Sequence, residues 1–187
     1  MFTPCSDLTQ YTFENFRINR GNRLAHAAAL AVAENPGADY SPLVMYEECL
    51  PEGKASEAKH LMFAIANRVE RVFPEKILVY IPGRIFRQNE VLTLLDCETC
   101  SKRYDAVDVL LIDDIQEIQY DIYTQKKVQY IIDSFYEKEK QVIITSSEHP
   151  CEIPDLDPIL ESQIMYGLVV NIKHDGETDN EWKEDLA

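Results

Sequence analysis

The sequence lacks any long hydrophobic run, and its first residues lack the basic and apolar regions of a signal peptide. No apolar stretch approaches the roughly 20 residues that a membrane-spanning helix needs. These absences predict a protein of the cytoplasm that has no membrane partner.

Cysteines in a pattern that could be paired are also lacking. The five cysteines are scattered and odd in number, which is typical of a reducing compartment. Cys97 and Cys100 form a CxxC pair, but no second CxxC or HxxxH completes a structural zinc site. We therefore expect no zinc.

Positive charge is scarce as well. The chain has 18 Lys and Arg against 33 Asp and Glu, which gives a formal net charge of −15. Because contacts with nucleic-acid phosphates need Lys and Arg, this balance argues against a broad nucleic-acid surface and leaves room only for a small basic patch. It favours attraction to a basic partner.

Predicted strands and helices alternate along the chain, which is long enough for one domain. The strands are predicted at 43–46, 77–81, 109–112, 142–147 and 168–172. Helices are predicted at 21–37 with Asn22 as N-cap, from the cap residue Ser56 to Pro74, at 85–95, and around 128–135. Such alternation predicts an α/β fold of three layers with a five-stranded parallel sheet.

The segment VDVLLIDDIQ, residues 107–116, contains the most informative motif. Its aliphatic run suits a strand buried on both faces, and the run ends at Asp113 and Asp114. Ligands of open α/β sheets bind at the carboxyl ends of the strands, where paired carboxylates can hold Mg²⁺. The pattern is that of a Walker B motif; the alternative is an acidic turn without a ligand.

The loop after the first predicted strand only partly fits the phosphate-binding pattern GxxxxGK[ST]. Gly53 and Lys54 supply the second glycine and the lysine, but Glu48 stands at the first glycine position. Ala55 takes the place of the hydroxyl residue, and Ser56 comes one position late. The nearby carboxylates of this loop would repel a phosphate.

Several segments together resemble the AAA+ ATPase domain of the DnaA family of bacterial replication initiators. They are YTFENF at 11–16, GNRLAHAAALAVAENPG at 21–37, SPLVMY, HLMFAIANRV, VDVLLIDDIQ and VIITSS. The resemblance covers about residues 11–172 and implies the P-loop NTPase fold of AAA+ proteins. In that family the domain binds ATP, assembles head to tail on the replication origin and opens duplex DNA.

At the positions that carry the family's chemistry, this sequence departs from the family pattern. Ser147 and Glu148 stand where the family has its sensor-1 aspartate and the following arginine, and Gln163 takes the place of the arginine finger. A glutamine cannot supply the cation that stabilises the transferring phosphoryl group, an effect worth about 10³–10⁵ in rate. The family's lid subdomain and DNA-binding domain are not expected in this chain. We divide it into an arm at 1–20, a DnaA-like domain at 21–172 and an acidic tail at 173–187.

Three functions are compatible with these patterns. The first is a non-catalytic DnaA-like protein, an inactive ATPase that acts in or regulates replication initiation through contacts with a DnaA-type initiator or with the replicative helicase or its loader. No cofactor is expected in that case. The second is a divergent ATPase or nucleotide switch, with Mg²⁺ at Asp113 and nucleotide held by residues Gly53, Lys54, Ser56, Asp113 and Asp114. The third is single-stranded DNA binding through a patch of Arg84, Arg87, Lys102 and Arg103.

Overall fold

A computed structural model describes residues 9–38, 40–48, 50, 53–86 and 105–174. Five strands form one parallel sheet in the order β2-β3-β4-β1-β5. Their bounds are β1 Leu43–Tyr46, β2 Leu78–Pro82, β3 Val109–Asp113, β4 Gln141–Ser146 and β5 Leu168–Asn171. The predicted five-stranded parallel sheet is confirmed, and each predicted strand lies within one residue of the observed one.

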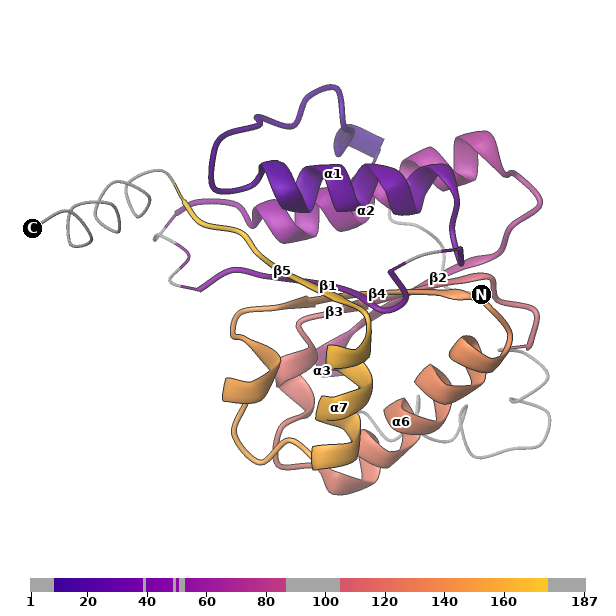
Figure 1. The fold of residues 1–187 in the computed structure, drawn as a ribbon, viewed down its shortest axis with the longest axis vertical. Coiled ribbons are helices and arrows are strands. Elements are labelled where there is room, and N and C mark those ends of the chain that lie inside the picture. Colours follow the sequence, from indigo (N-terminus) through magenta and orange to yellow (C-terminus); the bar gives the residue numbers. More distant parts are fainter. Residues whose placement is uncertain (1–8, 39, 49, 51–52, 87–104, 175–187) are drawn as a thin grey trace, which may run out of the picture.

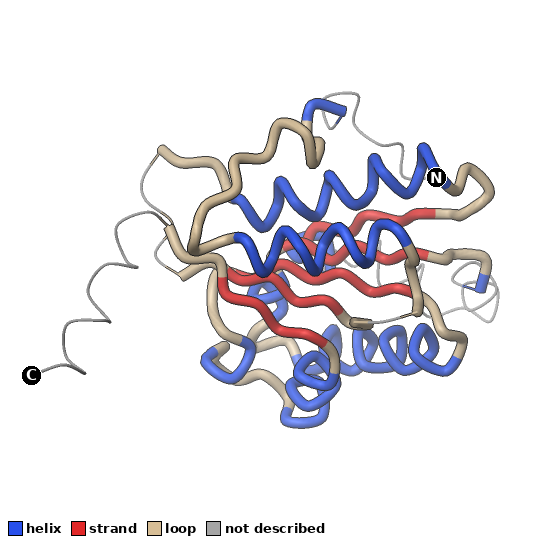
Figure 2. Tube along the Cα trace, turned by 45° about the horizontal axis from the view of Figure 1, so that its top comes forward, coloured by secondary structure: helices blue, strands red, loops and turns tan. Residues whose placement is uncertain are grey.

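Helices cover both faces of this sheet (Figure 1). On one face lie α1 Arg23–Glu34 and α2 Glu57–Val72. The other face carries α3 Gly83–Phe86, α6 Ile122–Glu137, α7 Pro158–Tyr166 and the short 3₁₀ helices η2 Ile115–Ile118 and η3 Pro150–Glu152. In Figure 2 the strands lie between these two helical layers, so the predicted three-layer architecture is confirmed.

The two faces of the sheet pack into two separate apolar cores. Residues alternate between them along β3: Val109 and Leu111 pack under α1 and α2, whereas Leu110 and Ile112 pack against α6. All five residues of β3 are buried. This burial on both faces is the reason that the strand appears in the sequence as an unbroken aliphatic run.

The first predicted helix differs from the observed α1 in its bounds and in its cap. Helix α1 is shorter than predicted, and the side chain of its N-cap, Asn22, makes no capping bond. That side chain instead accepts from the backbone N–H of Asn19 and donates to the carboxylate of Glu57, which joins α1 to the start of α2. Ser56 caps α2 as predicted, because its Oγ accepts from the N–H of Lys59 at 3.0 Å.

The segment 11–16 is expected to be part of an extended arm, but residues 13–15 form a turn and its aromatic rings pack on α2. The rings of Tyr11 and Phe16 both contact that of His60 edge-on at 5.1 Å. Only the start of the helix predicted at 85–95 is described, as α3, and both cysteines of the CxxC pair lie outside the described residues. No described helix is long and apolar enough to cross a membrane.

Candidate functional site

The carboxylate of Asp113 is buried at the carboxyl end of β3 and receives hydrogen bonds from both neighbouring strands. Thr145 of β4 donates to Oδ1 at 2.6 Å, and the hydroxyl of Tyr80 of β2 donates to Oδ2 at 2.7 Å. Asp113 is only 1% exposed. Burial and the hydrogen bond to Asp113 raise the pKa of Tyr80, so its phenol remains a neutral donor at physiological pH.

A lysine from the first turn of α2 completes this set of donors. The ammonium Nζ of Lys59 lies 2.9 Å from Oδ2 of Asp113 and 3.4 Å from Oδ2 of Asp114. Burial acts to lower the pKa of Lys59, but hydrogen bonding to Asp113 and the charges of both aspartates outweigh it, and the pKa is raised. Lys59 therefore carries a fixed positive charge against the aspartate pair at neutral pH.

The backbone around Asp114 is shaped to turn away from the sheet at this point. Asp114 adopts a left-handed conformation with φ of 57°, and its N–H donates to Oγ1 of Thr145 at 3.1 Å. Gly83 approaches it so closely that a Cβ there would lie 2.2 Å from the carbonyl oxygen of Asp114. Thr145 thus holds both aspartates, one through its hydroxyl proton and the other through its oxygen.

A second buried carboxylate lies at the N-terminus of α2. Glu47 follows β1 directly, is 4% exposed, and its N–H donates to the carbonyl of Ser146 at 3.1 Å. Its carboxylate accepts from the backbone N–H of Glu57 at 2.8 Å and from the hydroxyl of Ser56. The ring atom Nε2 of His174, which is also buried, lies 3.6 Å from Oε1 of Glu47.

The residues predicted from the phosphate-loop pattern are not all brought together. Asp113 and Asp114 stand at the strand end as predicted, but Lys54 is exposed and the ammonium beside Asp113 belongs to Lys59. Gly53 has a φ of 78° and no atom within 4 Å of the position that a Cβ would take. The hydroxyl of Ser56 binds the N–H of Lys59 and the carboxylate of Glu47.

The altered sensor and finger positions make local contacts. The N–H of Ser147 donates to the side chain of Gln116 at 3.2 Å. Gln163 on α7 donates to Asp133 of α6, and it lines a cavity of about 210 Å³ together with Tyr136 and Tyr166. The side-chain amide of Gln163 therefore makes its hydrogen bond to a residue of the same domain.

Of the predicted basic patch, only one residue is described. Arg84 is exposed on α3, whereas Arg87, Lys102 and Arg103 lie outside the described residues.

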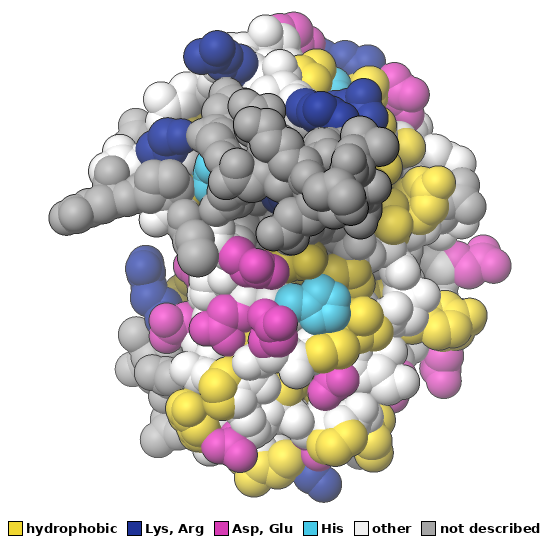
Figure 3. All heavy atoms as spheres, turned by 60° about the vertical axis from the view of Figure 1, so that its left-hand side comes forward, with side chains coloured by type: hydrophobic (Ala, Val, Ile, Leu, Met, Phe, Trp, Pro, Cys, Tyr) yellow, Lys and Arg dark blue, Asp and Glu magenta, His cyan; other side chains and the backbone are white. Residues whose placement is uncertain are grey.

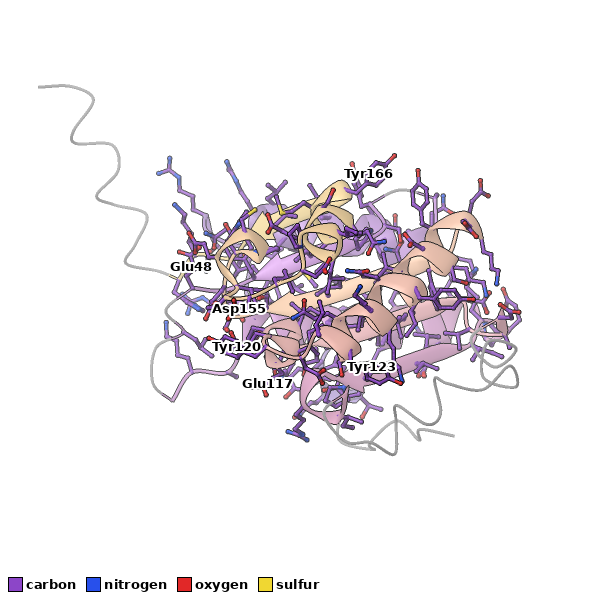
Figure 4. All side chains as sticks on the ribbon, turned by 90° about the horizontal axis from the view of Figure 1, so that it is seen from below. Glu48, Glu117, Tyr120, Tyr123, Asp155 and Tyr166 are labelled. Atoms are coloured by element: carbon purple, nitrogen blue, oxygen red, sulfur yellow. The ribbon has the colours of Figure 1, made fainter. Side chains whose placement is uncertain are left out.

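The surface around the carboxyl ends of the strands is acidic. Glu48, Asp155, Tyr120 and Glu117 follow one another along this end of the molecule, away from Tyr166 (Figure 4). Acidic side chains also gather beside a histidine on the face seen in Figure 3. The pKa of Tyr46, at the end of β1, is raised by burial and by the nearby charge of Glu48.

Sequence reasoning missed Lys59, Thr145 and Tyr80, and it treated the carboxylates of the loop after β1, Glu47 among them, only as a source of repulsion. A signal for Lys59 was present, because it lies in the first turn of a helix whose cap, Ser56, was predicted. Thr145 and Tyr80 lie within predicted strands, and only the strand order shows that they flank Asp113.

A parallel sheet of this order, with a helix that begins after β1 and an aspartate pair at the end of β3, defines a P-loop NTPase domain of the AAA+ class. The family model described as "Bacterial DnaA ATPase domain" matches residues 8–171. The chain belongs to this DnaA family.

Known proteins similar to this chain include DnaA itself. The chromosomal replication initiator protein DnaA of Deinococcus radiodurans is 39% identical over 166 residues, which are 88% of this chain and 34% of that protein. This chain thus spans about a third of the length of that relative.

Two solved structures are similar over nearly the whole chain. Domain III of DnaA from Thermotoga maritima has a TM-score of 0.80 at 30% identity and covers 91% of this chain and 69% of its own. AMPPCP-bound DnaA from Aquifex aeolicus has a TM-score of 0.77 at 30% identity and covers 90% of this chain and 51% of its own.

The ion pair predicts different effects for two lysines of the same region. Lys59→Met leaves the buried charge of Asp113 without its cation, and because Lys59 is partly exposed we expect a loss of about 1–3 kcal/mol in unfolding free energy, less than for a fully buried pair. Lys54→Met at the exposed position should change it by less than about 0.5 kcal/mol. Urea denaturation measures both, and equal effects of the two changes would contradict the assignment.

The raised pKa of Lys59 also predicts a pH dependence. A cation with a folded-state pKa above its ordinary value of 10.5 contributes its stability fully below pH 10.5 and loses it as the pH rises through the folded-state pKa. The difference in unfolding free energy between the native chain and Lys59→Met should therefore be constant from about pH 7 to 9 and shrink above about pH 10.5. Denaturation at a series of pH values measures it, and a difference that grows with pH would refute the ion pair.

Proposed function

We propose that this domain acts in the initiation of DNA replication as a DnaA-type subunit that works without bound nucleotide, through contacts with other proteins. The place in replication is supported by family membership and by the relative from Deinococcus radiodurans, which is a chromosomal replication initiator. The proposal that the domain neither binds nor hydrolyses nucleotide is supported by the contacts of Asp113 and by the charges around it.

The position of Lys59 is the observation that carries this proposal. In P-loop NTPases the strand-end aspartate helps to hold Mg²⁺, and the ion bridges the β- and γ-phosphates. Here the ammonium of Lys59 lies 2.9 Å from Asp113, and Thr145 and Tyr80 donate to the same carboxylate. A divalent cation at this carboxylate would be repelled by the ammonium and would have to displace it. The surroundings of Asp113 therefore suit an ion pair with Lys59 better than a bound Mg²⁺ ion.

The charges around the site support the same proposal. A nucleoside triphosphate would approach a surface that carries Glu48, Glu117 and Asp155, with Glu47 buried behind it. Carboxylates close to a phosphate repel it, and this surface offers no compensating glycine-rich loop in the described residues. Gln163, at the finger position, has no positive charge for a neighbour's nucleotide.

A DnaA-type initiator, or the replicative helicase or its loader, is the proposed partner. The resemblance to a family that assembles head to tail makes another DnaA-type subunit the first candidate. Without a cation at the finger position, this domain would join such an assembly but would not complete the catalytic site of its neighbour. It would then limit the growth or the activity of the assembly.

Calorimetric titration with MgATP and MgADP tests the absence of nucleotide binding. We expect no heat of binding at millimolar nucleotide, whereas DnaA from Aquifex aeolicus, which has been solved with AMPPCP, serves as the positive control. Micromolar binding, about −8 kcal/mol, that disappears in both Lys54→Ala and Asp113→Asn would overturn the proposal and establish a nucleotide switch.

Cross-linking with purified DnaA and purified replicative helicase from the same cell tests the protein contacts. We expect a cross-linked complex with one of them. If the partner is kept in one nucleotide state, added ATP should not change the yield of this complex, because the domain itself binds no nucleotide. No complex with either protein, or with the loader, would exclude the proposed role.

A further inference from the structure

The carboxylate of Glu47 lies where the candidate site would hold an anion. Helix α2 has 16 residues, and the N-terminus of such a helix favours negative charge because its first N–H groups have no partner within the helix. The N–H of Glu57, the first residue of α2, donates to Glu47 at 2.8 Å. The hydroxyl of the N-cap Ser56 donates to the same carboxylate.

The backbone fixes Glu47 at this place. Glu47 directly follows β1, and its N–H extends the ladder of the sheet by bonding to the carbonyl of Ser146. Ligands of open α/β sheets bind at the carboxyl ends of strands, and phosphates bind at the N-termini of the helices that follow them. Glu47 occupies both positions, because it follows the carboxyl end of β1 and its carboxylate lies at the N-terminus of α2.

A buried histidine gives an independent indication that this position is built for an anion. Nε2 of His174 has no hydrogen-bond partner, although His174 is only 3% exposed. It points towards Oε1 of Glu47 at 3.6 Å, which is longer than a hydrogen bond. At the start of α2, a backbone donor, a hydroxyl donor and a ring nitrogen therefore surround one carboxylate.

We propose that Glu47 is an internal substitute for a phosphate group and permanently fills the anion-binding position at the N-terminus of α2. This inference deepens the proposed function and rests on it, since it states what fills the nucleotide site in place of a nucleotide. Lys59 and Glu47 then supply, from the chain itself, the positive and the negative charge that a metal–phosphate pair would bring. The domain is consequently held in one state that nucleotide does not change.

Glu47→Ala tests this inference, with inorganic phosphate as the probe. The variant should have a lower Tm than the native chain, because the donors at α2 lose their acceptor. Phosphate should then restore stability by entering the vacated position, raising the Tm of the variant by about 3–6 °C at ten times its Kd. The native chain should shift by less than about 1 °C in the same phosphate.

Matched controls separate a specific site from general effects of charge. Glu48→Ala removes the same charge from the adjacent, exposed residue and should respond to phosphate as the native chain does. Sodium chloride at the same ionic strength should not replace phosphate. If Glu47→Ala gains no more from phosphate than Glu48→Ala does, the inference is overturned.

Glu47→Gln keeps the inference testable if Glu47→Ala does not fold. The amide keeps the size of the side chain and removes its charge, so the Tm should fall below that of the native chain. An unchanged Tm would show that the negative charge is not what fills the position. The two failures can be told apart. No cross-linked complex would overturn the protein contacts of the proposed function, whereas the absence of a specific phosphate effect in Glu47→Ala would overturn only the role of Glu47.

Discussion

The buried carboxylate of Asp113 is the constraint on which the rest of the site depends. A carboxylate that is 1% exposed is costly unless it is paired and hydrogen-bonded, and its partners here come from three different elements. Tyr80 reaches it from β2, Thr145 from β4 and Lys59 from α2. The same interaction therefore fixes the two strands beside β3 and the first turn of α2 relative to one another.

This arrangement changes what the carboxyl ends of the strands can bind. In the nucleotide-binding members of the fold class, the charges at the strand-end aspartate and at the helix N-terminus are balanced by a metal ion and a phosphate that come and go. On our proposals, Lys59 and Glu47 balance them from within the chain. A site whose charges are balanced by its own side chains needs neither a metal ion nor a phosphate.

Most of the fold could be predicted because its signals are local. The aliphatic run of β3, the cap of α2 at Ser56 and the strand boundaries are each encoded by neighbouring residues. The site was predicted less well because its signals are not local. Lys54 follows Gly53 as the phosphate-loop pattern requires, whereas Lys59, the lysine that reaches Asp113, is marked only by its place in the first turn after the cap Ser56.

The sequence by itself determined the three layers, the parallel sheet, the aspartate pair at the end of β3 and the family, because hydrophobic periodicity and order along the chain carry that information. Only the tertiary structure decided which lysine pairs with Asp113 and where the carboxylate of Glu47 goes. The physical reason is that each contact joins separate elements, Lys59 of α2 with Asp113 of β3 and Glu47 after β1 with the N-terminus of α2, and no local pattern encodes how α2 packs on the sheet.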